Sequence, residues 1–129
     1  DLIVSNPPFY TAGFETENSA RNKARSTSFL SFKELVEGVV NIISKNGKFV
    51  VILPFLEEPN FISLAAKNNL FLNRVCRVQG NSLSEIKRTL LEFSLTKTNI
   101  KEEHLIIELS RHQYTEAYVN LTKDFYLKM

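Results

Sequence analysis

The order of hydrophobic patterns in the first half of the chain constrains its fold most strongly. Residues 2–4 (LIV) and 48–53 (KFVVIL) are apolar and rich in β-branched side chains, a pattern typical of strands that are covered on both faces. Between these segments, apolar residues recur at helical spacing from residue 32 to residue 43. A strand, a helix and a second strand in this order predict an α/β fold with a parallel sheet and right-handed crossovers.

The two ends of this helix are marked in the sequence. Ser31 and Glu34 have the spacing of a capping box, which predicts a helix start at residue 32. Gly47, behind Lys45 and Asn46, is the expected stop, because glycine is favoured just after the last turn of a helix.

The remainder of the chain predicts short helices and close-set strands. Residues 11–28 lack a hydrophobic period and are expected to form a polar loop. The other expected elements are a helix at 60–68, strands at 70–78, 89–96 and 104–109, and a last helix capped by Thr115 with Tyr114, Tyr118, Leu121 and Phe125 on a core-facing side. Strands joined by short turns favour antiparallel pairing, so we expect antiparallel strands at the edge of the parallel sheet.

Composition and charge restrict the classes of function. The 129 residues suit one domain, and 16 basic against 14 acidic residues leave a net charge of +2, too small to indicate nucleic-acid binding by itself. Cys76 is the only cysteine, which excludes an intrachain disulfide and a cysteine-based metal cluster. His104 and His112 lack further ligands at zinc-site spacing, so no metal is expected. Signal-peptide and membrane-spanning patterns are absent, and a cytoplasmic protein without membrane contact is expected.

The segment directly after the first predicted strand, Asn6-Pro7-Pro8-Phe9, combines rigidity with hydrogen-bond acceptors. In an open α/β sheet, ligands bind at the carboxyl ends of the strands, which is where this segment falls. Prolines lack N–H groups and hold the residue before them extended, so the turn presents carbonyl oxygens. The Asn6 side chain adds an acceptor and Phe9 adds an aromatic face. The set suits a planar ring that carries an exocyclic NH₂ group, although a plain strand-ending turn would use the same residues.

Such a site can activate an aromatic amine without a side-chain nucleophile or a metal. The lone pair of the amine is delocalised into the ring, which makes the nitrogen a poor nucleophile. Accepting its two hydrogens on the Asn6 side chain and the Pro7 carbonyl favours a pyramidal nitrogen and directs its lone pair. Transfer of a methyl group from a sulfonium donor then needs chiefly positioning and charge stabilisation. We therefore expect Asn6, Pro7, Pro8 and Phe9 to form the catalytic site.

Basic residues follow the motif at two places. The candidate substrate-binding residues of the predicted loop are Tyr10, Arg21, Lys23 and Arg25. Phosphate contacts and base stacking would suit them, but so would a solvated loop and a packed tyrosine, and both interpretations stand. Lys87 and Arg88 precede a predicted strand, where solubility or protection of a sheet edge explains them nearly as well as a function.

The motif and four longer stretches resemble a known enzyme family. The segment DLIVSNPPF resembles motif IV, (D/N/S)PP(Y/F/W), of class I S-adenosylmethionine-dependent amino-methyltransferases, in which it grips the nitrogen that is methylated. The further stretches, ARNKAR before SFLSFKEL, GKFVVILP, EIKRTLLEFSL and LTKDFYLKM, are similar to the tRNA(adenine-N6)-methyltransferases. The resemblance spans essentially the whole chain. It implies S-adenosylmethionine as cofactor and, as substrate, an adenine beside the anticodon of a valine tRNA.

Class I enzymes also carry a glycine-rich cofactor loop, which this sequence does not contain. Its glycines, none of them in a G-x-G setting, are Gly13, Gly38, Gly47 and Gly80. The resemblance implies that the cofactor-binding part precedes Asp1, and that residues 1–129 form the C-terminal, substrate-side part of a Rossmann-like methyltransferase domain. We expect this part alone to be inactive and to bind no cofactor measurably.

Other functions remain open from the sequence. Protein-glutamine methyltransferases that act on release factors and guanine-N2 methyltransferases of ribosomal RNA also carry NPP-aromatic motifs. A noncatalytic α/β module that binds RNA or protein is an alternative of another class. A sheet edge left without a neighbouring strand would also allow two copies of the chain to pair as a homodimer.

Overall fold

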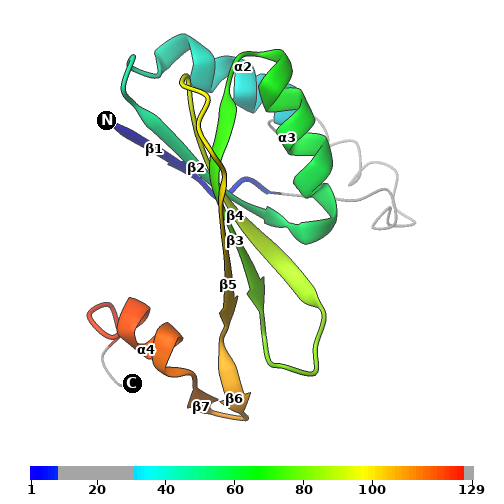
Figure 1. Cartoon of the computed structure of the whole chain (residues 1–129), viewed down its shortest axis with the longest axis vertical. Helices are drawn as coiled ribbons and strands as arrows, with labels where there is room; N and C mark the ends of the chain where they lie inside the picture. Colours follow the sequence, from blue (N-terminus) through cyan, green and yellow to red (C-terminus); the bar gives the residue numbers. More distant parts are fainter. Residues whose placement is uncertain (9–30, 127–129) are drawn as a thin grey trace, which may run out of the picture.

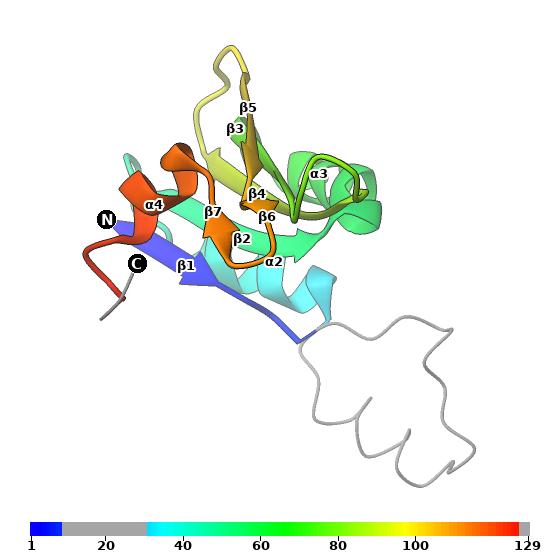
Figure 2. The same ribbon diagram turned by 90° about the horizontal axis from the view of Figure 1, so that it is seen from below.

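The computed structural model describes residues 1–8 and 31–126, which form a twisted sheet with helices on both sides (Figure 1). Its elements are β1 (Leu2–Ser5), α2 (Phe32–Ile42), β2 (Lys48–Pro54), the 3₁₀ turn η2 (Phe55–Glu57), α3 (Glu58–Lys67), β3 (Phe71–Gln79), β4 (Ile86–Ser94), β5 (Lys101–Ile106), β6 (Glu108–Ser110), β7 (Gln113–Tyr114) and α4 (Glu116–Thr122). Helices α2 and α3 cover one face of the sheet, and α4 lies on the other side (Figures 1 and 2). No helix in the described ranges is long and apolar enough to cross a membrane.

The five-stranded sheet has the order β1-β2-β4-β3-β5 and confirms the α/β class. β1 pairs in parallel with β2, and β3 in parallel with β5, whereas β4 is antiparallel to both β2 and β3. Four strands therefore share one direction and β4 alone is reversed. The expectation that antiparallel strands lie at the edge is wrong for β4, whose Leu91 and Phe93 are fully buried and require the interior position.

Helix α2 begins where the sequence predicts but ends for a different reason. The Ser31 side chain accepts a hydrogen bond from the Glu34 backbone N–H at 3.1 Å, which confirms the cap. The helix ends at Ile42, and none of the described glycines has a positive φ, so Gly47 is no left-handed cap. A Cβ at Gly47 would lie 2.8 Å from the Ser44 Oγ. Glycine is needed there because the chain passes close to the preceding turn.

Three phenylalanines from three elements form the centre of the core between the helices and the sheet. The ring of Phe61 in α3 lies 6.4 Å from Phe49 of β2 and 5.7 Å from Phe93 of β4, between ring centroids. All three side chains are fully buried. The other buried apolar residues are Leu35, Val36, Val39, Val51, Leu53, Ala65, Leu70, Val75 and Leu91.

Several boundaries differ from those predicted. α3 begins two residues earlier than predicted, with Pro59 in its first turn. β4 begins at Ile86 rather than residue 89, because Arg88 and Ile86 continue the ladder with β3 around a bulge at Lys87. The charges at 87 and 88 hide the strand pattern in the sequence. β5 begins at Lys101, and the end of the predicted strand at 104–109 belongs partly to the small β6–β7 hairpin.

Two surfaces predicted as core are exposed. β1 is an edge strand, and only its Ile3 packs on the core, while Leu2 and Val4 are 63% and 68% exposed. Both lie on the face opposite α2 and α3, so the prediction of a strand buried on both faces is wrong for the described part of the chain.

The predicted cap of α4 is confirmed, because Thr115 accepts from the Tyr118 N–H. The prediction that the apolar side of α4 faces the core is not confirmed, since Phe125 is 86% exposed.

The first prediction concerns Thr89 in β4, whose fully buried Oγ1 has no hydrogen-bond partner among the described residues. Replacing it with valine keeps the shape and removes an unsatisfied polar group, so Thr89→Val should raise the free energy of unfolding by about 1 kcal/mol in urea denaturation. The same change at Thr115 removes a cap and a 2.6 Å bond to the Ile106 carbonyl. Thr115→Val should lower stability by about 1 kcal/mol. A destabilising Thr89→Val would contradict the assignment.

Candidate functional site

The Asn6-Pro7-Pro8 segment lies at the carboxyl edge of the parallel strands, as the sequence predicts. β1 ends at Ser5, which pairs with Val51 of β2, and Asn6 follows directly. Asn6 and Pro8 are exposed and Pro7 is half-buried. The Asn6 side chain makes no hydrogen bond with another described residue, so its amide oxygen is available to a ligand. Asn6 and the Pro7 carbonyl offer two acceptors on an anchored strand end.

The other predicted site residues are not placed by the structure. Phe9, Tyr10, Arg21, Lys23 and Arg25 lie outside the described residues. Their proposed roles in stacking and phosphate binding therefore stay predictions.

A buried ion pair fixes the segment that follows β2 at the same edge. The Arg77 guanidinium of β3 donates to the Glu58 carboxylate at 2.6 and 3.2 Å, and Glu58 is 6% exposed. Arg77 also lies 3.5 Å from Glu102 and 6.0 Å from the Phe55 ring centroid. The hydrogen bond to Glu58 raises the pKa of Arg77 further above its ordinary value. The sequence does not indicate this pair, because Arg77 lies 19 residues further along the chain and on another element.

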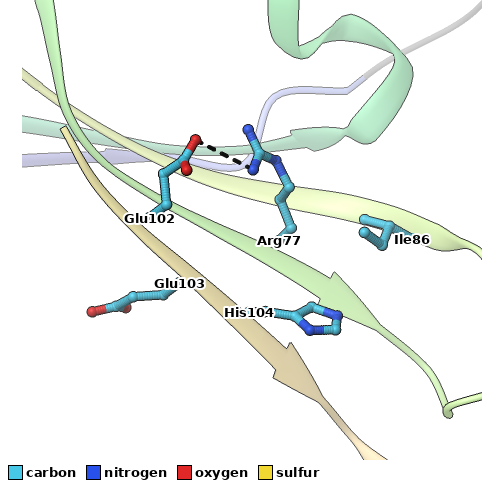
Figure 3. A pocket seen from close by; sticks show the side chains of 5 residues that line it. All are labelled: Arg77, Ile86, Glu102, Glu103 and His104. Carbon is cyan, nitrogen blue, oxygen red and sulfur yellow. Dashed lines mark ion pairs between the residues drawn. The ribbon is translucent and has the colours of Figure 1, made fainter.

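A shallow cavity of about 300 Å³ lies beside this pair and is lined by residues of β3, β4 and β5 (Figure 3). Glu102 points toward Arg77, while Glu103 and His104 lie below them in the view (Figure 3). His104 Nε2 lies 2.9 Å from the Gln79 Oε1, so this imidazole has a structural partner. No group of three or more potential metal ligands occurs within residues 1–8 and 31–126.

A larger recess of about 500 Å³ lies between the open face of the sheet and α4. Val50 and Leu90 contribute apolar surface from the sheet, and Leu121 contributes it from α4. Cys76 also lines the recess, and burial raises the pKa of its thiol. Neither this recess nor the smaller cavity is lined by Asn6.

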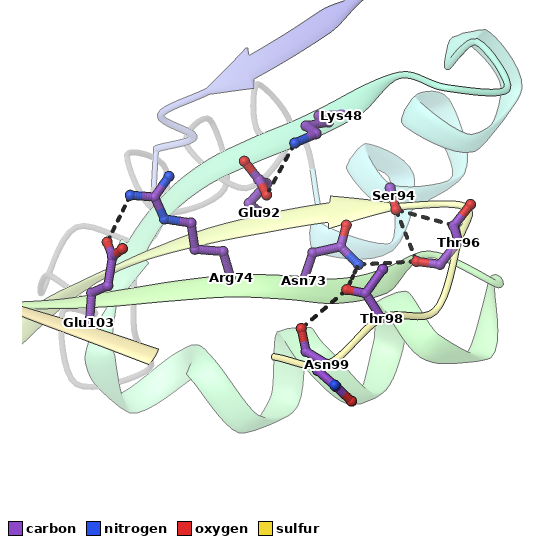
Figure 4. A network of polar contacts seen from close by, with 9 residues as sticks. All are labelled: Lys48, Asn73, Arg74, Glu92, Ser94, Thr96, Thr98, Asn99 and Glu103. Atoms are coloured by element: carbon purple, nitrogen blue, oxygen red, sulfur yellow. Dashed lines mark hydrogen bonds and ion pairs between the residues drawn. The ribbon is translucent and has the colours of Figure 1, made fainter. Parts of the chain in front are cut away.

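Polar contacts next to the recess hold the strands together (Figure 4). Glu103 pairs with Arg74 at 2.9 Å and with Lys101 at 3.1 Å, and the hydrogen bond from Arg74 lowers the pKa of Glu103. Asn73 donates to the Thr96 carbonyl at 3.0 Å and to Thr98 Oγ1 at 2.9 Å. These contacts fix β3, β5 and the turn between β4 and β5, and they are structural.

Comparisons with known proteins give relatives over the whole chain and a solved structure of similar fold. No family model matches the chain. The tRNA1(Val) (adenine(37)-N6)-methyltransferases of Flavobacterium psychrophilum, Flavobacterium johnsoniae and Bacteroides fragilis are 45%, 46% and 42% identical to it, over 100% of its length. The chain is therefore similar to these enzymes over its whole length. It spans 54–55% of the length of these relatives, so it corresponds to about half of such a protein.

A solved structure supports the fold independently. The crystal structure of a predicted O-methyltransferase, protein Atu636 from Agrobacterium tumefaciens, superposes with a TM-score of 0.57. The match covers 71% of this chain and 45% of that one, at 12% identity. At this identity the likeness concerns the fold alone.

The second prediction tests the ion pair that anchors α3. Glu58→Gln removes the nearer and more buried of the two carboxylates that pair with Arg77, so the free energy of unfolding should fall by about 1–3 kcal/mol. Glu57→Gln is the matched control, because Glu57 forms no ion pair with another described residue, and it should change stability by less than about 0.5 kcal/mol. Equal effects of the two substitutions in urea denaturation would show that the pair contributes nothing.

Proposed function

We propose that the complete protein methylates the N6 amine of an adenine in tRNA, next to the anticodon, with S-adenosylmethionine as methyl donor. The observation that carries this proposal is the position of Asn6-Pro7-Pro8 at the carboxyl edge of β1, in a chain 45% identical to an enzyme of that name. The position provides two acceptors at the edge where α/β sheets bind ligands.

In this mechanism the chain's own residues hold and orient the amine. The Asn6 amide oxygen and the Pro7 carbonyl each accept one hydrogen of the adenine NH₂ group, which directs the nitrogen lone pair away from the ring. Phe9 covers the base, and the cations of the 11–28 segment contact tRNA phosphates. Extruding a base costs a few kcal/mol and less from a loop than from a duplex. S-adenosylmethionine supplies an electrophilic methyl group, and the described residues offer no glycine-rich loop to hold it.

We also infer that residues 1–129 are the C-terminal, substrate-side part of a larger domain, which alone binds the cofactor poorly or not at all. The relatives are nearly twice as long as this chain, which supports the inference. The exposed apolar side chains Leu2 and Val4 on an edge strand support it as well, since such surfaces normally pack against protein.

The third prediction concerns Asn6. In the complete protein, Asn6→Ala removes one acceptor from the reacting amine and should lower kcat about 10²–10³-fold, a loss typical of one positioned hydrogen bond. S-adenosylmethionine affinity, measured by calorimetry, should stay unchanged. Asn46→Ala, in the turn before β2, is the control and should retain full turnover. An Asn6→Ala enzyme with normal kcat would refute the role of Asn6.

The substrate is tested separately on the unchanged complete protein. Methylation of unmodified valine tRNA at adenine, detected by nucleoside mass spectrometry, is the expected result. Methylation of a release-factor glutamine or of a guanine in ribosomal RNA instead would assign one of the related activities. Binding of RNA without any methyl transfer would assign a noncatalytic module.

The fourth prediction tests the proposed domain organisation. If the rest of the complete protein packs on β1, then Val4→Asp buries a charge there and should lower the free energy of unfolding by about 2 kcal/mol or more. Leu83→Asp is the control, because Leu83 is 97% exposed at the β3–β4 turn, and it should have little effect.

Equal stabilities of these two variants would show that the β1 surface faces solvent in the complete protein. A Val4→Asp effect that coincides with dissociation of a dimer, seen by light scattering, would assign the surface to a second copy instead.

A further inference from the structure

The basic residues of the sheet divide into two groups by their contacts. Lys48, Arg74, Arg77 and Lys101 each pair with a carboxylate, at distances of 3.8, 2.9, 2.6 and 3.1 Å. Lys87 and Arg88 in β4 form no ion pair with any residue of the described ranges. The Arg88 side chain donates a hydrogen bond from its Nη1 to the Lys87 carbonyl at 3.2 Å. Both side chains are exposed, and their charge is available to an anion.

The strand pairing removes one explanation for these two cations. Charged residues often protect an unpaired sheet edge from aggregation. β4 is an interior strand, however, and Arg88 lies between Pro54 of β2 and Val78 of β3. Edge protection therefore does not account for Arg88.

The reversed direction of β4 brings its beginning to the carboxyl edge of the other strands. Asn6 follows Ser5, which is opposite Val51, while Arg88 is opposite Pro54 at the end of β2. Asn6 and Arg88 are separated by two strand spacings across the sheet and by about two residues along the strands. Their backbones therefore lie about 12 Å apart. Phosphates next to a nucleotide held at Asn6 lie within reach of a cation at this distance.

Arg88 is also on the side of the sheet that is open. Thr89, Leu91 and Phe93 alternate along β4 and are buried beneath the helices, so Arg88 lies on the opposite face, together with Val4 of β1. Lys87 is the extra residue of the bulge between the Val78–Arg88 and Gln79–Ile86 pairs, and it adds a positive charge next to Arg88. Glu85 is the acidic residue of the preceding turn and forms no ion pair with either cation in the described structure.

We infer that Arg88, with Lys87, forms a phosphate subsite that binds the RNA strand beside the nucleotide held at Asn6. A guanidinium binds a phosphate through two parallel hydrogen bonds, and an ammonium adds a point charge. Neutralising phosphates releases counterions, which makes the binding dependent on salt. The inference rests on the proposed function for its partner, a tRNA.

The test uses the complete protein and unmodified valine tRNA. Arg88→Glu and Lys87→Glu should each raise KM for tRNA about tenfold or more while leaving S-adenosylmethionine affinity and the Tm unchanged. Arg88→Ala should reduce the slope of log K for tRNA binding against log salt by about 1, the value expected for one lost phosphate contact. Arg88→Lys keeps a charge but loses the bidentate geometry, so its KM should lie between those of the wild type and Arg88→Ala.

Lys45→Glu is the matched control, because Lys45 is exposed in the turn before β2, at the opposite edge of the sheet. It should leave KM and the salt slope as they are. If the Arg88 and Lys87 variants behave like Lys45→Glu, the subsite does not exist, whatever the enzyme methylates. If the wild type binds tRNA with an Arg88-dependent salt slope but does not methylate it, the subsite stands and the proposed reaction fails.

Discussion

The packing of Phe61 between Phe49 and Phe93 holds the described structure together. Phe61 comes from α3, while its partners come from β2 and from β4, so this one cluster fixes the helix over two neighbouring strands. With α3 fixed, its first residue Glu58 reaches Arg77 of β3. The phenylalanine cluster therefore fixes α3 on the sheet, and the ion pair between Glu58 and Arg77 fixes the start of α3 at the carboxyl ends of the strands.

The sequence predicted the elements whose hydrophobic pattern is local. The periodicity of residues 32–43 and the apolar run at 48–53 predicted α2 and β2 with nearly the observed bounds. The interior position of β4 was not predictable in the same way, because it depends on pairing between Phe49 and Phe93, which are far apart in the sequence. The exposure of Val4 was missed for a related reason: an apolar strand has the same pattern whether its second face is covered by this chain or by other protein.

The candidate site likewise combines features that the local sequence predicts with features that depend on distant parts of the chain. The position of Asn6 directly after a strand followed from the apolar run at residues 2–4 and the prolines behind it, and the structure confirms that position. Its role in binding stays a prediction. The contacts of Arg77 with Glu58, and the lack of an ionic partner at Arg88 in the described structure, arise from neighbours on other strands. No spacing in the sequence relates a charge to a partner across a sheet. Such sites become visible only when strand order and register are known.

The turn between β3 and β4 can change in length with little effect on the stability of the sheet. Gln79 and Ile86 close the ladder, and the turn residues beyond them contribute no side chain to the buried core. Lengthening a surface turn costs little, because loop-closure entropy grows slowly with the number of residues. Insertions between Gly80 and Glu85 can therefore extend the protein surface beside Arg88 while every pairing in the sheet is kept. The length of this turn can therefore vary at little cost to folding.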